Sequence, residues 1–293
     1  MVMRTAGYIG VMVVILLGPS ALAGDTSPDG RALWHRYFGS ESGNLQRYGR
    51  VEIPRENRER CRAVRDLFSE IGAREILLSS SDEGEQAECP GNIVVVLAGE
   101  ISDAIIVSAH LDRAGSGRGA VDDFSGVVMQ GMLYLYFKDR HHRHTLVFAV
   151  FDGEEVGQMG SRRFIEESRW ISGRVTAVVN LECLGVMLPH SWAEGSSDRL
   201  EDMLTRVGKK WGMDCGPVSI KNVSADSIPF LRAGYPAITI EGIGPEHIGL
   251  LGTDWDRQSV VRGDILDATF TVLVDFINTL DALMAAPNPA YER

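Results

Sequence analysis

Basic residues are scarce in this chain relative to acidic ones. Lysine and arginine total 29 against 40 aspartates and glutamates, so the formal net charge is −11. A surface of that sign repels nucleic-acid phosphates, and we therefore expect no nucleic-acid partner. Hydrophobic residues make up 44% and charged residues 24%, which is ordinary for a globular protein and argues against disorder. The 293 residues suit one large α/β domain or two small ones.

Long apolar runs are also missing, apart from one near the start. Residues 7–18 form an apolar stretch of 12 residues that follows Arg4, and Ala21-Leu22-Ala23 then gives small residues in an A-x-A pattern. This order is typical of a signal peptide, residues 1–23, because the apolar stretch is too short to span a bilayer comfortably. Cleavage after Ala23 removes one positive charge and leaves the mature chain near −12. We expect export to the periplasm or the extracellular space, with an uncleaved membrane anchor as the alternative and no stable membrane insertion after cleavage.

Cysteine is rare, and the reactive motifs that use cysteine or serine are missing. The mature chain has Cys61, Cys89, Cys183 and Cys215, with no C-x-x-C, so a thiolate zinc site and a thioredoxin-like motif are not supported. Four cysteines in an oxidising compartment allow two disulfides in three pairings. We favour Cys61 with Cys89 and Cys183 with Cys215, because each pair is near in sequence, and free buried thiols are the alternative. No G-x-S-x-G is present, which argues against a serine hydrolase.

The rest of the chain alternates between short apolar runs and helical patterns. Strands are expected at 92–98, 104–109, 145–151, 175–181, 218–220 and 237–240, and helices at 56–72, 123–140, 161–169, 196–211, 228–233 and 265–283. We expect the helix at 123–140 to be amphipathic. Strands that alternate with helices predict an α/β fold, in which a mixed, largely parallel sheet is covered by helices on both faces. The expected organisation is a single domain over residues 24–293, with a lead-in and helix at 24–90 and a catalytic core at 91–285.

Polar residues follow three of the apolar strands. His110-Leu111-Asp112 comes after the run IIVSA, Asp152-Gly153-Glu154-Glu155 after LVFAVF, and Glu182 after VTAVVNL. Ligands of open α/β sheets bind outside the carboxyl ends of the strands, so these side chains should meet at one edge. Carboxylates crowded there repel one another unless cations neutralise them. Imidazole together with carboxylate oxygen suits zinc, with cobalt or manganese as substitutes.

The motifs in this region carry a family resemblance. The order H-L-D, G-A-V-D-D-F-S-G, F-D-G-E-E-V-G-Q-M-G-S and N-L-E resembles the zinc aminopeptidases of the family that also contains glutamate carboxypeptidases and the transferrin receptor, and it looks like the bacterial leucyl aminopeptidases. The segment 224–238 (SADSIPFLRAGYPAI) resembles the stretch before that family's last metal-binding histidine. The resemblance covers roughly residues 90–280. It implies the zinc-exopeptidase (phosphorylase/hydrolase-like) fold and two Zn²⁺ ions per chain.

The resemblance also implies a ligand set. His110 and Glu182 would bind the first ion, Asp122 would bridge both ions, and Glu155 and His247 would bind the second. Two positions depart from the family's pattern. Many members have aspartate where Glu182 stands, and the Thr-x-x-Asp stretch that commonly follows the last histidine is loosened after His247.

Two further residues have expected roles in the reaction. Glu154 would be the general base, and Asp112 would orient and polarise His110. Their expected substrates are peptides with a free terminus, although the sequence leaves amino- and carboxypeptidase action open. It also leaves the oligomeric state open.

Two other functions compete with the dizinc peptidase. A glutaminyl cyclase has the same fold, uses one zinc ion and can carry an F-D-G-E-E stretch. A non-enzymatic binding module on this fold would have lost its metal ligands, whereas all five candidates are present here. The remaining histidines are expected to have no catalytic role. His141, His142 and His144 are expected in a solvated turn, His35 in the lead-in and His190 in a loop.

Overall fold

The structure is a computed structural model, and it describes residues 28–38, 51–73, 76–80, 91–167 and 173–283. The expected signal peptide, residues 1–23, lies outside these ranges, so its prediction is not tested. None of the helices within them combines the length and apolar character that a membrane span requires.

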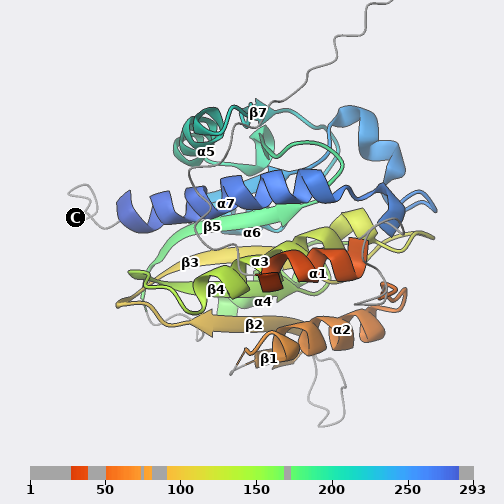
Figure 1. Cartoon of the computed structure of the whole chain (residues 1–293), viewed down its shortest axis with the longest axis horizontal. Helices are drawn as coiled ribbons and strands as arrows, with labels where there is room; N and C mark the ends of the chain where they lie inside the picture. The colour runs from red at the N-terminus through yellow and green to blue at the C-terminus, as the bar shows by residue number, and fades with distance from the viewer. Residues whose placement is uncertain (1–27, 39–50, 74–75, 81–90, 168–172, 284–293) are drawn as a thin grey trace, which may run out of the picture.

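Within the described ranges, eight strands form one mixed sheet at the centre of the molecule (Figure 1). The spatial order is β1-β2-β4-β3-β5-β8-β6-β7. The strands are β1 (Ile76–Ser80), β2 (Gly91–Leu97), β3 (Ile101–His110), β4 (His144–Phe151), β5 (Val175–Glu182), β6 (His190–Trp192), β7 (Pro217–Val218) and β8 (Ala237–Glu241). The central strands β4, β3, β5 and β8 are parallel, whereas β1, β2 and β6 pair antiparallel with their inner neighbours. The predicted α/β class and largely parallel sheet are therefore confirmed.

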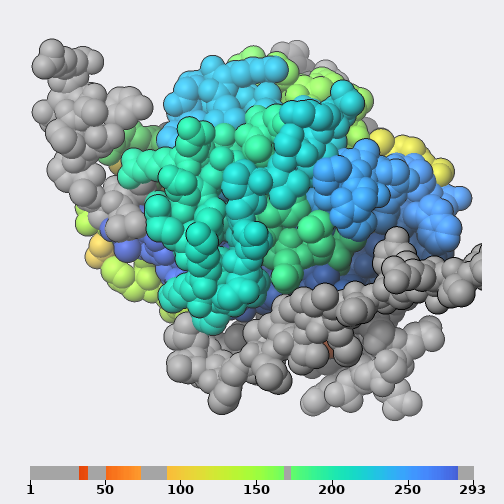
Figure 2. Space-filling model, turned by 90° about the horizontal axis from the view of Figure 1, so that it is seen from above, coloured from red at the N-terminus to blue at the C-terminus, as the bar shows by residue number. Residues whose placement is uncertain are grey.

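Helices cover both faces of this sheet (Figure 1). The longer helices are α1 (Pro28–Phe38), α2 (Asn57–Glu70), α3 (Ser125–Phe137), α4 (Met159–Glu167), α5 (Asp198–Lys210), α6 (Ser227–Arg232) and α7 (Gly263–Leu283). Apolar residues of α2, α3, α5 and α7 share one core cluster with one face of the strands, and those of α4 and α6 share a second cluster with the other face. Figure 2 shows the molecule from above the view of Figure 1, where the residues around α5, in teal, lie at the surface.

The central helix differs from its prediction because it lies under other helices. Almost every side chain of α3 is buried, including Gln130, whose amide donates a hydrogen bond to the carbonyl of Ala149. A helix that is covered on all sides needs no polar face, so the expectation of an amphipathic helix was wrong. The expected start at residue 123 was also early, since a short π-helical turn from Ala120 to Phe124 precedes α3.

Several histidines are more buried than their neighbours in sequence suggest. His144 opens β4 with 1% of its surface exposed and forms a 2.9 Å ion pair with Asp281 of α7. His142 is also buried, and its Nδ1 lies 2.8 Å from the carbonyl oxygen of His144. His190 is a buried residue of β6, not of a loop. The prediction of solvated or loop positions was wrong for these three residues. Of the three histidines in this turn, His141 is the exposed one, with a surface ion pair to Glu100.

The cysteines separate into two kinds. Cys183 and Cys215 are free and buried, so the expected disulfide between them was wrong. Cys183 follows the last residue of β5, whereas the Cys215 thiol packs against Gly208 of α5. Cys61 is disulfide-bonded, and its expected partner, Cys89, lies outside the described residues.

Candidate metal centre

Three neighbouring parallel strands change from apolar to polar toward their carboxyl ends on one face. On this face β3 ends with Ser108 and His110, and β5 ends with Asn180 and Glu182. The third strand, β8, ends with Thr239 and Glu241, which are the register partners of Asn180 and Glu182. Earlier residues of the same face, such as Ile106 and Val178, belong to the apolar core. Period-two alternation therefore places two rows of polar side chains at the carboxyl edge of the sheet.

The inner row, one step back from the edge, orients the outer one. The hydroxyl of Ser108 donates to Oδ1 of Asn180 at 2.7 Å, and Nδ2 of Asn180 donates to Oε1 of Glu182 at 2.9 Å. The amide thus fixes one oxygen of Glu182, which leaves Oε2 free to face His110. Nε2 of His110 lies 3.6 Å from this oxygen.

His110, Asp122 and Glu182 form a compact group of possible metal ligands. Their ligand atoms all lie within 4.8 Å of one another. Nε2 of His110 is 3.0 Å from Oδ1 of Asp122, so one ring nitrogen faces both carboxylates. An imidazole nitrogen and two carboxylate oxygens converging on one point are a donor set that zinc accepts. The structure therefore brings together the three residues expected to hold the first ion.

Asp112 connects this group to the turn that carries the glutamate pair. Nδ1 of His110 lies 3.1 Å from the backbone carbonyl oxygen and 3.4 Å from Oδ1 of Asp112. The same carboxylate accepts hydrogen bonds from the backbone N–H groups of Glu154 and Glu155, both at 3.1 Å. A single buried aspartate therefore sets the orientation of the imidazole and the position of both glutamates.

Asp123, which follows Asp122, has a structural role. Its Oδ2 accepts a hydrogen bond from the backbone N–H of His110, and its Oδ1 accepts one from the backbone N–H of Cys183. The residue thereby ties the end of β3 to the end of β5. Asp122, which precedes it through a cis peptide bond, points its carboxylate at His110 instead.

Crowding of buried carboxylates dominates the electrostatics of the site. Burial raises the pKa of Glu154 to about 9, and the charge of Glu182 acts in the same direction. Burial and the charge of Asp122 raise the pKa of Glu155 to about 7. Burial alone would lower the pKa of His110, but the carboxylates of Glu182, Asp112 and Asp122 outweigh it and raise that pKa well above the ordinary value. Such a site favours positive charge at its centre.

Three buried charged residues near the site were missed by the sequence reasoning. Glu241 ends β8 beside Glu182, and Asp226 precedes α6 and accepts a hydrogen bond from Ser161 at 2.5 Å. Arg60 of α2 has no exposed surface and donates to the carbonyls of Leu111, Arg118 and Gly119. Glu241 follows the run AITI as Glu182 follows its own strand, so the same pattern would have found it. Nothing local in the helix sequence marks Arg60.

Arg60 is a buried cation behind the acidic centre. Burial lowers its pKa to about 10, and Asp256, Asp112 and Asp122 oppose this shift. Its guanidinium group also lies over the ring of Phe124, 5.2 Å from the centroid. The three carbonyls that it binds belong to Leu111 and to the segment Arg118-Gly119, so Arg60 fixes both ends of the loop 112–119 that leads to Asp122.

The second expected ligand set is only partly assembled. Glu155 is half-buried, and its Oε1 accepts a hydrogen bond from the backbone N–H of Ala114 at 2.8 Å. His247 lies in the 3-10 turn Pro245–Leu250, where its Nδ1 accepts a hydrogen bond from Gly244 at 3.1 Å. In the part of the chain that the structure describes, Asp122, Glu155 and His247 do not gather as closely as the first set does.

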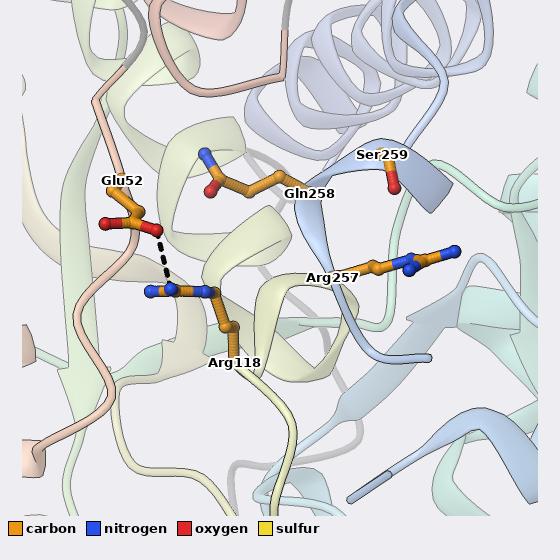
Figure 3. Close-up of a pocket in the computed structure, with 5 residues that line it drawn as sticks. All are labelled: Glu52, Arg118, Arg257, Gln258 and Ser259. Atoms are coloured by element: carbon orange, nitrogen blue, oxygen red, sulfur yellow. Dashed lines mark ion pairs between the residues drawn. The ribbon is translucent and has the colours of Figure 1, made fainter. Parts of the chain in front are cut away.

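A separate cavity of about 430 Å³ lies between the N-terminal segment at residue 52 and the residues 118 and 257–259 (Figure 3). It is lined by Glu52, Arg118, Arg257, Gln258 and Ser259. Arg118 and Glu52 form an ion pair of 2.5 Å across it. Its lining contains none of the candidate ligands, so this cavity is distinct from the metal centre.

Comparison with known proteins identifies sequence relatives. The family model described as Peptidase family M28 matches residues 92–259, which is more than half of the chain. A vacuolar membrane protease of Eremothecium gossypii is 42% identical over 84 residues, covering 28% of this chain and 8% of that protein. A probable zinc metalloprotease of Pyrenophora tritici-repentis is 35% identical over 78 residues, covering 27% of this chain and 18% of that protein. The matches therefore span less than a fifth of these relatives.

Solved structures resemble the fold. LapA of Legionella pneumophila has a TM-score of 0.69 and 17% identity, covering 88% of this chain and 74% of that one. BSAP, a zinc aminopeptidase from Bacillus subtilis, has a TM-score of 0.58 and 19% identity, covering 67% and 51%. A glutaminyl cyclase of Porphyromonas gingivalis has a TM-score of 0.65 and 15% identity, covering 85% and 97%. At these identities the likeness concerns the fold alone.

Proposed function

This chain belongs to peptidase family M28 and is a metallopeptidase, and we propose that it is a dizinc exopeptidase that removes the first residue of peptides. The observation that carries the proposal is the convergence of His110, Asp122 and Glu182 to within 4.8 Å at the carboxyl edge of the sheet. A probable zinc metalloprotease among the sequence relatives and a zinc aminopeptidase among the similar structures agree with zinc and with attack on peptide ends.

The residues present fit zinc. The first ion would be held by His110, Asp122 and Glu182, and the second by Asp122, Glu155 and His247. The second set requires the turn Pro245–Leu250 to bring His247 closer to Asp122. Two ions also suit the charge of the site, because the carboxylates around it far outnumber its one imidazole and the buried Arg60. Zinc bound there would supply Lewis acidity toward the scissile carbonyl and the attacking water.

Glu154 is suited to move the proton in this reaction. It is buried and sits beside the ligand group, with its Oε1 accepting a hydrogen bond from Nε2 of Gln158 at 3.2 Å. Its pKa of about 9 without cations means that it is protonated near neutral pH, and positive charge at the centre lowers this pKa. The carboxylate can then take a proton from water and deliver it to the leaving amine. The carboxylate of Asp112 keeps Glu154 in place by accepting a hydrogen bond from the backbone N–H of Glu154.

Hydrolysis of terminal-residue substrates tests this function. The purified protein would be assayed with aminoacyl-nitroanilides, with N-blocked aminoacyl-nitroanilides and with peptides blocked at either end, before and after a chelator and after zinc is restored. We expect release from free-amino substrates that the chelator abolishes and zinc restores. Cleavage only of substrates with a free carboxyl end would replace the aminopeptidase by a carboxypeptidase.

A glutaminyl cyclase is the second candidate. The specific observation in its favour is that, of the two ligand sets, the structure assembles only one closely, and the cyclases are expected to use one zinc ion. Conversion of an N-terminal glutaminyl substrate to its cyclic product, without hydrolysis of aminoacyl-nitroanilides, would establish this function instead.

Location and domain division remain predictions. Export would follow from the signal peptide at residues 1–23, and the mass of the mature protein tests cleavage after Ala23. We also retain the catalytic core at residues 91–285 as a proposal.

A further inference from the structure

Glu241 occupies the same depth and the same face as the candidate catalytic residues. It is the register partner of Glu182 on the neighbouring parallel strand, so the two side chains lie side by side on one face of the sheet. Its exposed fraction is 5%, compared with 4% for Glu182 and 8% for Glu154. The three carboxylates therefore open to the same small region at the carboxyl edge.

One oxygen of Glu241 has no partner. Oε2 is buried and accepts no hydrogen bond from any residue that the structure describes. The inner residue of the same strand differs, because the hydroxyl of Thr239 donates to Ser227 at 2.7 Å. A buried carboxylate oxygen without a donor is costly, so this atom calls for a donor from outside the chain. The neighbours whose charges act on it are mainly the carboxylates Glu182, Asp122 and Glu154.

The hydrogen-bond donor that Oε2 of Glu241 lacks is expected to be a cation, because the surrounding charges are negative, but not a zinc ion. A metal ion needs several donor atoms around it, whereas Oε2 of Glu241 is a single unpaired oxygen and its register neighbour Glu182 already belongs to the group with His110 and Asp122. An ammonium group does not require several acceptors in a fixed geometry, because each of its N–H groups can bond to a separate acceptor. A single carboxylate is enough to give it a charge-assisted hydrogen bond.

The distances also suit an ammonium group. In an amino-terminal residue the nitrogen lies about 2.5 Å from the carbonyl carbon. Neighbouring strands are about 4.8 Å apart. A nitrogen held at Glu241 would thus leave the first carbonyl within reach of the group formed by His110, Asp122 and Glu182. We propose that Glu241 binds the α-ammonium group of the substrate's first residue and thereby selects free amino termini, an inference that rests on the proposed exopeptidase function.

Direct binding to the zinc-loaded full chain tests this role. Leucinol carries the ammonium group, and 4-methylpentan-1-ol has the same carbon chain without it, and neither can be hydrolysed. Calorimetry at pH 7 would compare both ligands on the wild type, on Glu241→Gln and on Glu201→Gln. Glu201 of α5 is a matched control, because its Oε1 is likewise buried without a hydrogen-bond partner, but α5 packs against the other face of the sheet, with Ile240 in its core cluster.

We expect the wild type and Glu201→Gln to bind leucinol about 10- to 100-fold more tightly than the alcohol, as for a hydrogen bond to a charged group. In Glu241→Gln that preference should fall to about threefold or less, with zinc content unchanged. A preference that survives in Glu241→Gln would overturn the inference, and a loss of zinc from that variant would make Glu241 a metal ligand instead. Failure of the wild type to hydrolyse any aminoacyl-nitroanilide, with the leucinol preference intact, would reject the aminopeptidase but not the ammonium site.

Discussion

Two clusters of histidine and carboxylate lie at opposite ends of the same sheet, and they are built differently. At the amino end of β4, Asp281 accepts hydrogen bonds from the backbone N–H groups of Arg143 and His144, at 2.9 and 2.7 Å, and also faces Nδ1 of His144. At the carboxyl end of β3 and β5, one imidazole faces two carboxylates, Asp122 and Glu182.

The difference lies in whether the protein satisfies its own charges. The single carboxylate of Asp281 has backbone donors and a ring for both oxygens, and these N–H groups outweigh burial and lower its pKa. At the other end, burial and neighbouring carboxylates raise the pKa values of Glu154, Glu155 and Glu182. The first cluster is complete as a structural joint between β4 and α7, whereas the second has buried negative charge that cations from outside would neutralise. Residue type alone therefore does not distinguish a joint from a metal centre.

The largest effect is expected from Glu154→Gln, which removes the base but leaves the proposed ligands. We expect kcat for an aminoacyl-nitroanilide to fall about 100- to 10,000-fold. Zinc content should stay at the wild-type value, because the glutamine keeps the shape of the turn held by Asp112. Near-normal turnover in the variant would show that another group moves the proton.

Removing Asp122, which would contribute to both proposed ion sites, should weaken zinc binding at this end. At zinc concentrations a thousand times Kd, the wild type should gain about 4 kcal/mol of stability from the metal. Asp122→Ala should lose most of this gain and most of the bound zinc, as measured by thermal unfolding with and without chelator. An equal zinc-dependent rise in Tm for the two proteins would mean that Asp122 is not a ligand.

A substitution in the cluster of His144 and Asp281 should change the stability of the protein but not its catalytic activity. Asp281→Asn replaces an ionised acceptor of two backbone N–H groups, and we expect a loss of about 1–2 kcal/mol in the free energy of unfolding at pH 7. Because the folded pKa of Asp281 is lowered, its contribution is present above the ordinary value and is lost as the pH falls through the lowered one. Denaturant unfolding of the two proteins should therefore converge in acid. A change in kcat or zinc content would contradict the separation of the two ends.

The exposed histidine of the same turn gives the smallest expected effect. His141 has 77% of its side chain exposed, and its ion pair with Glu100 is a surface pair. His141→Ala should change the free energy of unfolding by less than about 0.5 kcal/mol. Adventitious zinc binding at this turn would appear as a fall in zinc content in His141→Ala with no change in activity.

The edge of the sheet could be predicted because apolar strand runs and motif order are local. The runs that end at His110 and Glu182 are nearly continuous apolar stretches, and parallel strands bring their carboxyl ends together whatever the loops do. The same reasoning extends to Glu241, which was overlooked because no motif marks it. These patterns predicted that His110 and Glu182 would meet at this edge, whereas Asp122, which lies in the turn Ala120–Phe124, was expected only from the family resemblance.

The features that could not be predicted depend on contacts between segments that are distant in the sequence. Arg60 reaches the carbonyls of Leu111 and Gly119, which lie 51 and 59 residues later in the sequence, and no local signal encodes that contact. His144 was expected in solvent because its sequence neighbours are charged, yet α7 covers it with Asp281. Sequence proximity also misled the pairing of Cys183 with Cys215, since a disulfide depends on spatial approach.

The most direct test of the central claim is the number of zinc ions bound per chain, measured by elemental analysis of the purified protein after zinc loading and removal of excess metal. An open carboxylate cluster that requires two cations predicts about two ions per chain in the wild type, and close to none after a strong chelator. A plateau at one ion would contradict the dizinc centre and favour the cyclase, and the absence of bound zinc would contradict the metal centre altogether.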